Sequence, residues 1–223
     1  MIAFCMPRAC ALRPDPWHPW RVRLDAMPID PREVEALFRD SGAFLEGHFV
    51  LASGRHAPRY LEKFQVLQWP RRTERLCAAI ADEARDLAIE TVAGPTTGGI
   101  ILAHEVARQL GCRAVYAERR EGEKGREFRR GFRLGEGERV LVVDDIMTTG
   151  GSAQETIDAV RAAGATVVGA AVLAKRSEGR VDVPLHALWE VKMESYDPAE
   201  CAQCRTGVPV VHPGTTIIAA AAG

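Results

Sequence analysis

Two adjacent carboxylates and a run of small hydroxylated residues follow a strongly apolar stretch in the second half of the chain. Residues 140–143 have the near-continuous branched apolar pattern of a strand buried on both faces of a parallel sheet. Asp144 and Asp145 follow, and Thr-Thr-Gly-Gly-Ser at 148–152 leads into an expected helix over 153–163. Small residues at a helix N-terminus let backbone amides approach a phosphate. Because the acids would repel a phosphate, they must face sugar hydroxyls or a metal ion, and the segment predicts a site for a phosphorylated sugar.

Two further segments have residue types suited to binding an anionic substrate. Gly-Pro-Thr-Thr-Gly-Gly at 94–99 is a second glycine-rich turn between an expected strand and helix, and it can hold an anion through backbone amides. A tight turn that only needs small residues is the alternative. The stretch 118–130 mixes acids and bases closely, which is typical of a solvated hairpin or loop. Beside two phosphate sites, its cations are also candidates for a mobile lid that excludes water.

The acid pair followed by TTGGS resembles the phosphoribosyl pyrophosphate (PRPP) signature of the type I phosphoribosyltransferases. Within that family, residues 46–63, a strand-turn-strand with a Ser-Gly-Arg turn, resemble the hood that covers the base in orotate phosphoribosyltransferases. Arg176 in AVLAKRSEGR and the segment 196–209 are similar to the same enzymes. The resemblance extends from about Ser41 to Pro213.

The resemblance implies a role for each matching position. Asp144, Asp145, Arg119 and Lys124 are the implied catalytic residues. The implied PRPP-binding residues are Arg119, Arg120, Lys124, Asp144, Asp145, Ile146, Met147, Thr148, Thr149, Gly150, Gly151, Ser152, Thr96, Thr97 and Gly98. The implied orotate-binding residues are Thr148, Arg176, Tyr60 and Leu61, with Arg176 on the orotate carboxylate. Mg²⁺ is expected to arrive with the substrate and to meet Asp144 or Asp145, directly or through water.

The chain departs from the pattern of the orotate enzymes in the lid, the hood and the second turn. Arg120 replaces a lysine, Lys124 is offset by one residue, and the lid contains no histidine. Gly98 stands where some relatives carry a lysine, and Ala52 stands where many do. Arg55 or Lys63 is a candidate to supply the missing hood cation.

Composition is that of an ordinary globular protein. The 223 residues are 47% hydrophobic and 26% charged, with a formal net charge of -1, so there is no bulk electrostatic argument for nucleic acid or an anionic membrane. No apolar run approaches the roughly 20 residues that cross a bilayer. We therefore expect no nucleic-acid partner and no membrane segment.

The six cysteines are irregularly spaced, which argues against a disulfide framework and for a reducing cytoplasm. Cys77 and Cys112 fall on expected apolar faces. Cys201 and Cys204 form a Cys-x-x-Cys pair that, with His212 nearby, is a candidate for part of a zinc site. Four ligands are required and a second pair is not evident, so a loop with two free thiols is the favoured interpretation.

The order of expected strands and helices predicts an α/β fold with a doubly wound parallel sheet and a small N-terminal hood. Residues 1–26, rich in proline and without periodicity, are expected to be a disordered leader or to precede the true start at Met27. A single domain is expected over 27–214, with a hood over about 42–68 that is joined by the C-terminal segment and a core over about 69–192. Residues 215–223 are an expected tail.

The strands are expected over 49–51, 60–67, 90–94, 114–118, 140–143, 166–173 and 185–191. The helices are expected over 33–40, 70–87, 99–110 and 153–163.

The predicted reaction is transfer of the 5-phosphoribosyl group of PRPP to orotate, giving orotidine 5'-monophosphate and pyrophosphate in de novo pyrimidine biosynthesis. A cytoplasmic homodimer that shares its lid across the interface is expected. Two alternatives remain, a phosphoribosyltransferase for a purine base and a non-catalytic PRPP-binding regulator. The hood and Arg176 argue against the first, and the acid pair with a cation-rich lid argues against the second.

Overall fold

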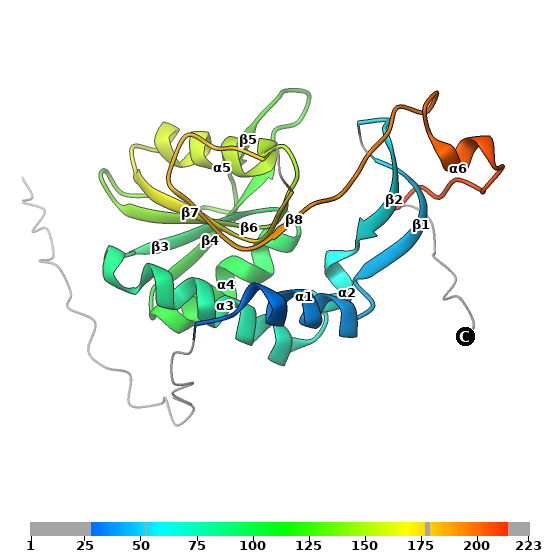
Figure 1. Cartoon of the computed structure of the whole chain (residues 1–223). Coiled ribbons are helices and arrows are strands. Elements are labelled where there is room, and N and C mark those ends of the chain that lie inside the picture. The colour runs from blue at the N-terminus through cyan, green and yellow to red at the C-terminus, as the bar shows by residue number, and fades with distance from the viewer. Residues whose placement is uncertain (1–27, 52, 177–178, 214–223) are drawn as a thin grey trace, which may run out of the picture.

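The computed structural model describes residues 28–51, 53–176 and 179–213, which form a two-stranded hairpin and a six-stranded sheet with flanking helices (Figure 1). The strands are β1 (Phe44–Val50), β2 (His56–Leu61), β3 (Thr91–Pro95), β4 (Arg113–Arg119), β5 (Arg126–Phe128), β6 (Arg139–Met147), β7 (Thr166–Arg176) and β8 (Leu185–Val191). The helices are α1 (Pro31–Asp40), α2 (Lys63–Leu67), α3 (Pro70–Ala84), the 3-10 turn η1 (Arg85–Leu87), α4 (Gly98–Leu110), α5 (Gly151–Ala162) and α6 (Ala202–Arg205).

The large sheet has the strand order β5-β4-β3-β6-β7-β8. All neighbours pair in parallel except β4 and β5, which form an antiparallel edge. Helices α3 and α4 cover one face and α5 covers the other (Figure 1). The predicted doubly wound parallel sheet is therefore confirmed.

Helix α1 shows how local sequence and packing agree. The Asp30 side chain accepts the amide of Arg32 at the N-terminus, and Pro31 occupies the first turn, where its missing N–H costs nothing. Val34 and Phe38, four residues apart, are fully buried. Phe38 packs on Trp189 of β8 with ring centroids 5.6 Å apart, so this face attaches α1 to the sheet.

The core lies on both faces of the sheet. The larger hydrophobic cluster gathers α1, α3 and α4 against the strands, with Leu76 and Leu102 among its fully buried side chains. The smaller one packs Ile157 and Val160 of α5 on the opposite face. Cys77 is buried in the larger cluster as expected from its helical face.

Several predicted boundaries were wrong. Strand β6 continues to Met147, so the acid pair lies inside the strand, and β7 continues to Arg176. Residues 63–67, expected to continue a strand, form helix α2. The polar stretch after β4 contains the short strand β5, which pairs back on β4 as a hairpin. Helix α6 was not expected.

The β1–β2 hairpin and the C-terminal segment lie side by side, away from the large sheet (Figure 1). Phe49 bridges Val211, and His56 bridges Tyr196. Arg55 donates hydrogen bonds to the hydroxyl and carbonyl oxygens of Ser195, at 3.0 and 2.6 Å. The hairpin is thus joined to a segment about 140 residues away in sequence.

The expectations for residues 1–27, Ala52 and 215–223 concern positions outside the described residues, and the expected domain limits stay predictions. Within the described ranges, no helix is long and apolar enough to cross a membrane.

Candidate active site

The site lies where the strand order reverses. The chain runs from β3 outward to β4, and from β6 outward to β7 in the opposite direction. At such a reversal, open α/β sheets bind ligands in a crevice at the carboxyl ends of the strands, which here are β3 and β6. The two glycine-rich turns meet there. A Cβ atom built on Gly98 would lie 1.9 Å from Oδ2 of Asp145, so only glycine lets the turn after β3 lie against the acid pair.

The acid pair is buried and held by local hydrogen bonds. Asp144 and Asp145 are 5% and 4% exposed. Asp144 Oδ1 accepts the Asp145 amide at 2.8 Å, and its Oδ2 accepts the Ser152 hydroxyl at 2.5 Å. Asp145 Oδ1 accepts the Ile146 amide at 2.6 Å. These bonds orient both carboxylates at the end of β6.

Burial and mutual repulsion make this pair costly to ionise. Burial first, and then the charge of Asp145, raise the pKa of Asp144 to about 6. Burial also raises the pKa of Asp145, although the Lys63 charge opposes it. Lys63 Nζ lies 3.2 Å from Asp145 Oδ2. Burial lowers the pKa of Lys63, but the two acids outweigh it and leave the pKa raised, so the lysine stays charged.

The turn after β6 presents hydroxyls and amides to solvent. Thr148 and Thr149 are exposed, and helix α5 begins at Gly151. Gly150 has φ +95°, and a Cβ there would lie 2.1 Å from the carbonyl oxygen of Arg180, so this turn requires glycine. The Gly151 amide makes only a long hydrogen bond, 3.5 Å, to Thr149 Oγ1, so the first amides of α5 remain available for an anion.

The side chains of the remaining residues predicted at this turn are not free to bind a ligand. Met147 is buried in a small core cluster, so only its backbone can contribute, and the Ile146 amide already serves Asp145. The Ser152 hydroxyl points to Asp144 rather than to solvent.

The turn after β3 is only partly free to bind a ligand. The Thr96 amide donates to Ala117 O at 3.1 Å, and its hydroxyl accepts from Arg126 at 3.1 Å. Thr97 is exposed, and the peptide bond between these threonines is cis. Thr97 and the backbone at Gly98 therefore remain as candidates for the anion.

The structure brings two of the predicted orotate residues together across the crevice. Tyr60 of β2 and Arg176 at the end of β7 are both half-buried, and each influences the pKa of the other. Burial lowers the pKa of Arg176, and among the described residues no carboxylate counters this effect. Leu61 is 5% exposed in the main core, so only its backbone can face a ligand.

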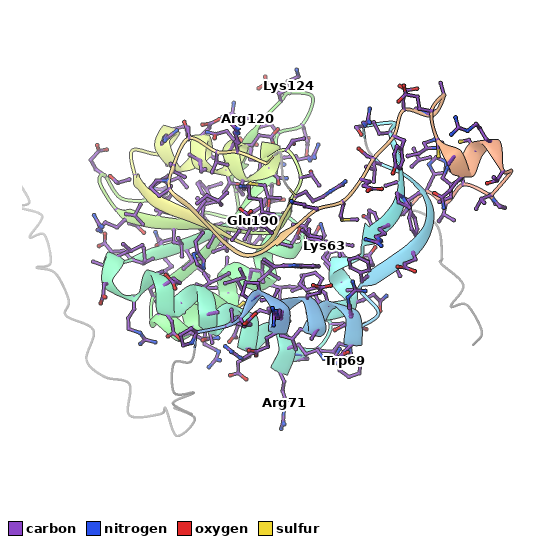
Figure 2. The ribbon with its side chains drawn as sticks, in the orientation of Figure 1. Lys63, Trp69, Arg71, Arg120, Lys124 and Glu190 are labelled. Atoms are coloured by element: carbon purple, nitrogen blue, oxygen red, sulfur yellow. The ribbon has the colours of Figure 1, made fainter. Side chains whose placement is uncertain are left out.

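Among the described residues, none of the predicted lid cations pairs with Asp144 or Asp145. Arg119 ends β4, whereas Arg120 and Lys124 belong to the β4–β5 turn at the top of Figure 2. Arg120 and Lys124 line a hollow against α5, together with Glu155. In this arrangement the turn is a solvated hairpin, and any closure over substrate remains a prediction.

Two cations at the site were not named among its predicted residues. Lys63, offered only as one of two candidates for the hood cation, lies between the hairpin and the sheet and reaches Asp145 (Figure 2). The other candidate, Arg55, instead binds Ser195. Arg126 is 4% exposed, contacts Thr96 and Ala117, and has Nε 3.4 Å from Glu155 without hydrogen-bond geometry. Burial lowers its pKa, and Asp144 is among the acids that raise it, so Arg126 adds buried positive charge beside Thr96 and within electrostatic range of Asp144.

Several known proteins are similar to this chain. The phosphoribosyl transferase domain model matches residues 65–197. An orotate phosphoribosyltransferase of Pelotomaculum thermopropionicum is 48% identical over 82% of this chain and 96% of its own length. One from Caldicellulosiruptor bescii is 45% identical, over 80% and 94%. The crystal structure of orotate phosphoribosyltransferase from Aeropyrum pernix is similar with a TM-score of 0.61 and 29% identity, covering 71% of this chain and 93% of that one.

Proposed function

The chain belongs to the phosphoribosyltransferase family and, within it, to the orotate phosphoribosyltransferases, and from this premise we propose which of its residues perform the reaction. The protein transfers the 5-phosphoribosyl group of PRPP to orotate and releases orotidine 5'-monophosphate and pyrophosphate, a step of pyrimidine biosynthesis. One carbon–oxygen bond of the sugar breaks and its electron pair leaves with pyrophosphate. A bond to a ring nitrogen of orotate forms, and the proton of that nitrogen is released to the pyrophosphate or to water. The protein itself forms no covalent bond, so its task is positioning and electrostatic stabilisation.

Arg176 carries the assignment of the base site. A half-buried guanidinium without a described carboxylate partner is costly to leave unpaired, and a planar carboxylate is the group that it binds best. Orotate brings that carboxylate. Tyr60 lies within electrostatic range of Arg176 and supplies a ring beside it. In this proposal the base lies between β2 and the end of β7, and Thr148 bounds it from the turn after β6.

PRPP occupies the other half of the crevice. The 5-phosphate is bound by the exposed hydroxyls of Thr148 and Thr149 and by the first amides of α5, where the helix dipole favours an anion. Thr97 and Gly98 line the pyrophosphate subsite, and Arg126 adds positive charge beside it, next to Thr96. The lid residues Arg119, Arg120 and Lys124 join only if the β4–β5 turn moves toward the crevice.

The acid pair acts on the ribose. Asp144 and Asp145 accept hydrogen bonds from ribose hydroxyls, which keeps the sugar in line between the leaving oxygen and the incoming nitrogen. Positive charge develops on the sugar as the bond to pyrophosphate breaks, and two fixed carboxylates in a buried setting stabilise it. Lys63 pairs with Asp145 and holds its carboxylate in place.

The acid pair also fits the Mg²⁺ that PRPP-dependent transferases generally use. Mg²⁺ takes oxygen ligands and keeps several waters, and both carboxylates offer oxygen atoms at the crevice. With PRPP bound, Mg²⁺ held there would supply positive charge to offset that of the departing pyrophosphate. Asp144 or Asp145 would hold it, directly or through water.

A homodimer with a lid shared across the interface, and a cytoplasmic location, stay part of the proposal. Lys124 lies well apart from Lys63, the residue that contacts Asp145 (Figure 2), which supports a role for Lys124 at the site of a neighbouring chain. Light scattering during gel filtration gives the oligomeric state, and mixing Lys124→Ala chains with Asp145→Asn chains tests for a shared site. Regained activity in the mixture supports sharing, and additive inactivity contradicts it.

The deciding experiment follows loss of orotate absorbance when purified protein, PRPP and Mg²⁺ are mixed, with and without EDTA. We expect orotate consumption that depends on Mg²⁺. Consumption of a purine base instead of orotate would support the first alternative function. PRPP binding with no base turned over would support the regulator.

A further inference from the structure

Four metal-binding side chains meet at the far end of the hairpin, away from the crevice. His48 lies in β1 and His56 begins β2. Cys201 immediately precedes α6, and Cys204 lies within it. One ligand atom from each residue lies within 4.8 Å of all the others. Two free thiols at Cys-x-x-Cys are the interpretation that the sequence favours, because no second pair of ligands is evident there. The two histidines supply that second pair.

Three sulfur–nitrogen separations are close to those of a tetrahedral metal site. His48 Nε2 lies 3.3 Å from Cys201 Sγ and 3.6 Å from Cys204 Sγ, and His56 Nδ1 lies 3.2 Å from Cys204 Sγ. Bond lengths of about 2.3 Å for zinc–sulfur and about 2.05 Å for zinc–nitrogen place tetrahedral S and N atoms about 3.6 Å apart. The two ring nitrogens are 2.8 Å apart, so they need to separate by about 0.5 Å to reach the tetrahedral distance of about 3.3 Å.

The surroundings already orient one ligand. His48 Nδ1 lies 2.8 Å from the carbonyl oxygen of Val208. Because a carbonyl can only accept, Nδ1 carries the proton, and the lone pair of Nε2 points to the centre of the cluster. A backbone carbonyl behind a histidine ligand is a common outer contact of metal sites.

Burial also fits a structural ion. His48, His56 and Cys201 are 1%, 8% and 2% exposed, whereas Cys204 is exposed and leaves an entry path. All four positions are occupied by protein ligands, which is typical of a structural site rather than a catalytic one.

We propose that His48, His56, Cys201 and Cys204 bind a structural zinc ion. Two thiolates and two imidazoles in tetrahedral array favour Zn²⁺ over the harder Mg²⁺ that accompanies PRPP. The inference concerns a site separate from the acid pair, and it does not depend on the substrate assigned to the crevice.

The ion would fasten the C-terminal segment to the hood hairpin. A two-stranded hairpin is marginal by itself, and this one lies outside the large sheet. His56 starts the strand that continues through Tyr60 and leads to Lys63, which contacts Asp145. Zinc at one end of β2 therefore steadies the residues at its other end that face the substrate.

The test begins with metal content. Full-length protein, purified in reducing buffer without chelator, is analysed by inductively coupled plasma mass spectrometry, and one zinc per chain is expected. Exchange for Co²⁺ should produce the visible absorption of tetrahedral cobalt and a near-ultraviolet thiolate charge-transfer band. Cys204→Ser, chosen because Cys204 is exposed, and His56→Asn should lose the zinc and the charge-transfer intensity. Cys112→Ser and His186→Asn are matched controls that should retain both.

A second measurement examines the hairpin itself. Removing the ion from wild-type protein with a zinc chelator should speed hydrogen exchange in residues 44–61 and 196–211, while α3 and α4 stay protected. The Cys112→Ser control should respond like the wild type. Because this readout uses the unmutated chain, it decides the matter even if a variant fails to fold.

Three results would overturn the proposal. They are wild-type protein that stays free of zinc after incubation with Zn²⁺ and gel filtration, zinc that remains in Cys204→Ser and His56→Asn, and a Cys201–Cys204 disulfide found under reducing conditions. Activity toward orotate can be absent while zinc is bound, so failure of the proposed reaction and failure of the zinc site are distinguishable.

Discussion

Replacing Arg176 with alanine should weaken orotate far more than PRPP. Arg176 ends β7, is half-buried beside Tyr60, and has no described carboxylate acting on its pKa. A charge-assisted hydrogen bond contributes about 1.5–3 kcal/mol, and a guanidinium can make two to one carboxylate. Partial exposure reduces the sum, so we take about 3 kcal/mol for the pair. At about 1.4 kcal/mol per tenfold, kcat/KM for orotate should fall about 100-fold.

Steady-state kinetics measure this effect with one substrate varied and the other saturating. Arg176→Ala should change kcat/KM for PRPP by less than about threefold, because its partner is on the base. Arg176→Lys keeps the charge but loses the planar fork, so it should fall between the wild type and alanine. Lys175→Ala is the matched control, since Lys175 pairs with Glu190 at 3.3 Å and should leave both constants unchanged.

Uracil lacks the carboxylate of orotate. Wild type and Arg176→Ala, each assayed with orotate and with uracil, therefore form a double-mutant cycle between protein and ligand. The mutation should reduce the preference for orotate over uracil by the same factor that it costs orotate. Equal losses for orotate and PRPP would refute carboxylate binding by Arg176. An unchanged preference over uracil would refute it as well.

Three other perturbations test the site and the fold. The pKa of Asp144 is raised from 3.8 to about 6, so the folded state holds this proton more tightly than the unfolded chain does. The free energy of unfolding should therefore fall by up to about 3 kcal/mol as the pH rises from 3.8 to about 6. Urea titrations should show this pH-dependent loss in the wild type but not in Asp144→Asn, and parallel pH profiles would contradict the burial argument. Gly98→Ala places a Cβ 1.9 Å from Asp145 Oδ2, so activity should drop about 100-fold. In the control Gly135→Ala the nearest atom to the new Cβ is 3.5 Å away, so its activity should stay near that of the wild type. Activity retained by Gly98→Ala would mean that the two turns do not touch as described. Phe38→Ala should cost about 3–5 kcal/mol in denaturant unfolding because the ring is fully buried against the sheet, and a loss below about 1 kcal/mol would show that α1 contributes little.

Local patterns predicted most of the architecture. Alternating apolar strands and amphipathic helices indicated the parallel sheet, and strand β8 was predicted with its observed bounds. The turn at 148–152 was recognised because its glycines, hydroxyls and following helix are contiguous. Such features depend on neighbours in the chain, which a single sequence displays directly.

Boundaries were less predictable because ladder hydrogen bonds extend a strand through polar residues. Asp144 remains in β6 by pairing in register with Val172, although its side chain is charged. The stretch 63–67 looked like a continuing strand, yet it turns into α2, whose N-terminus is capped by Glu62. Apolar runs this short fit either state until packing decides.

The sequence by itself determined the sheet, the phosphate turn and the family, since each rests on contiguous residues. Tertiary structure alone decided which distant groups meet. Lys63 reaches Asp145 because β2 returns toward β6, and Arg126 lies beneath Thr96 because β5 folds back on β4. His48 and His56, eight residues apart across a hairpin, join two cysteines about 150 residues away. Strand register and chain return set these meetings, and no spacing along the chain encodes them.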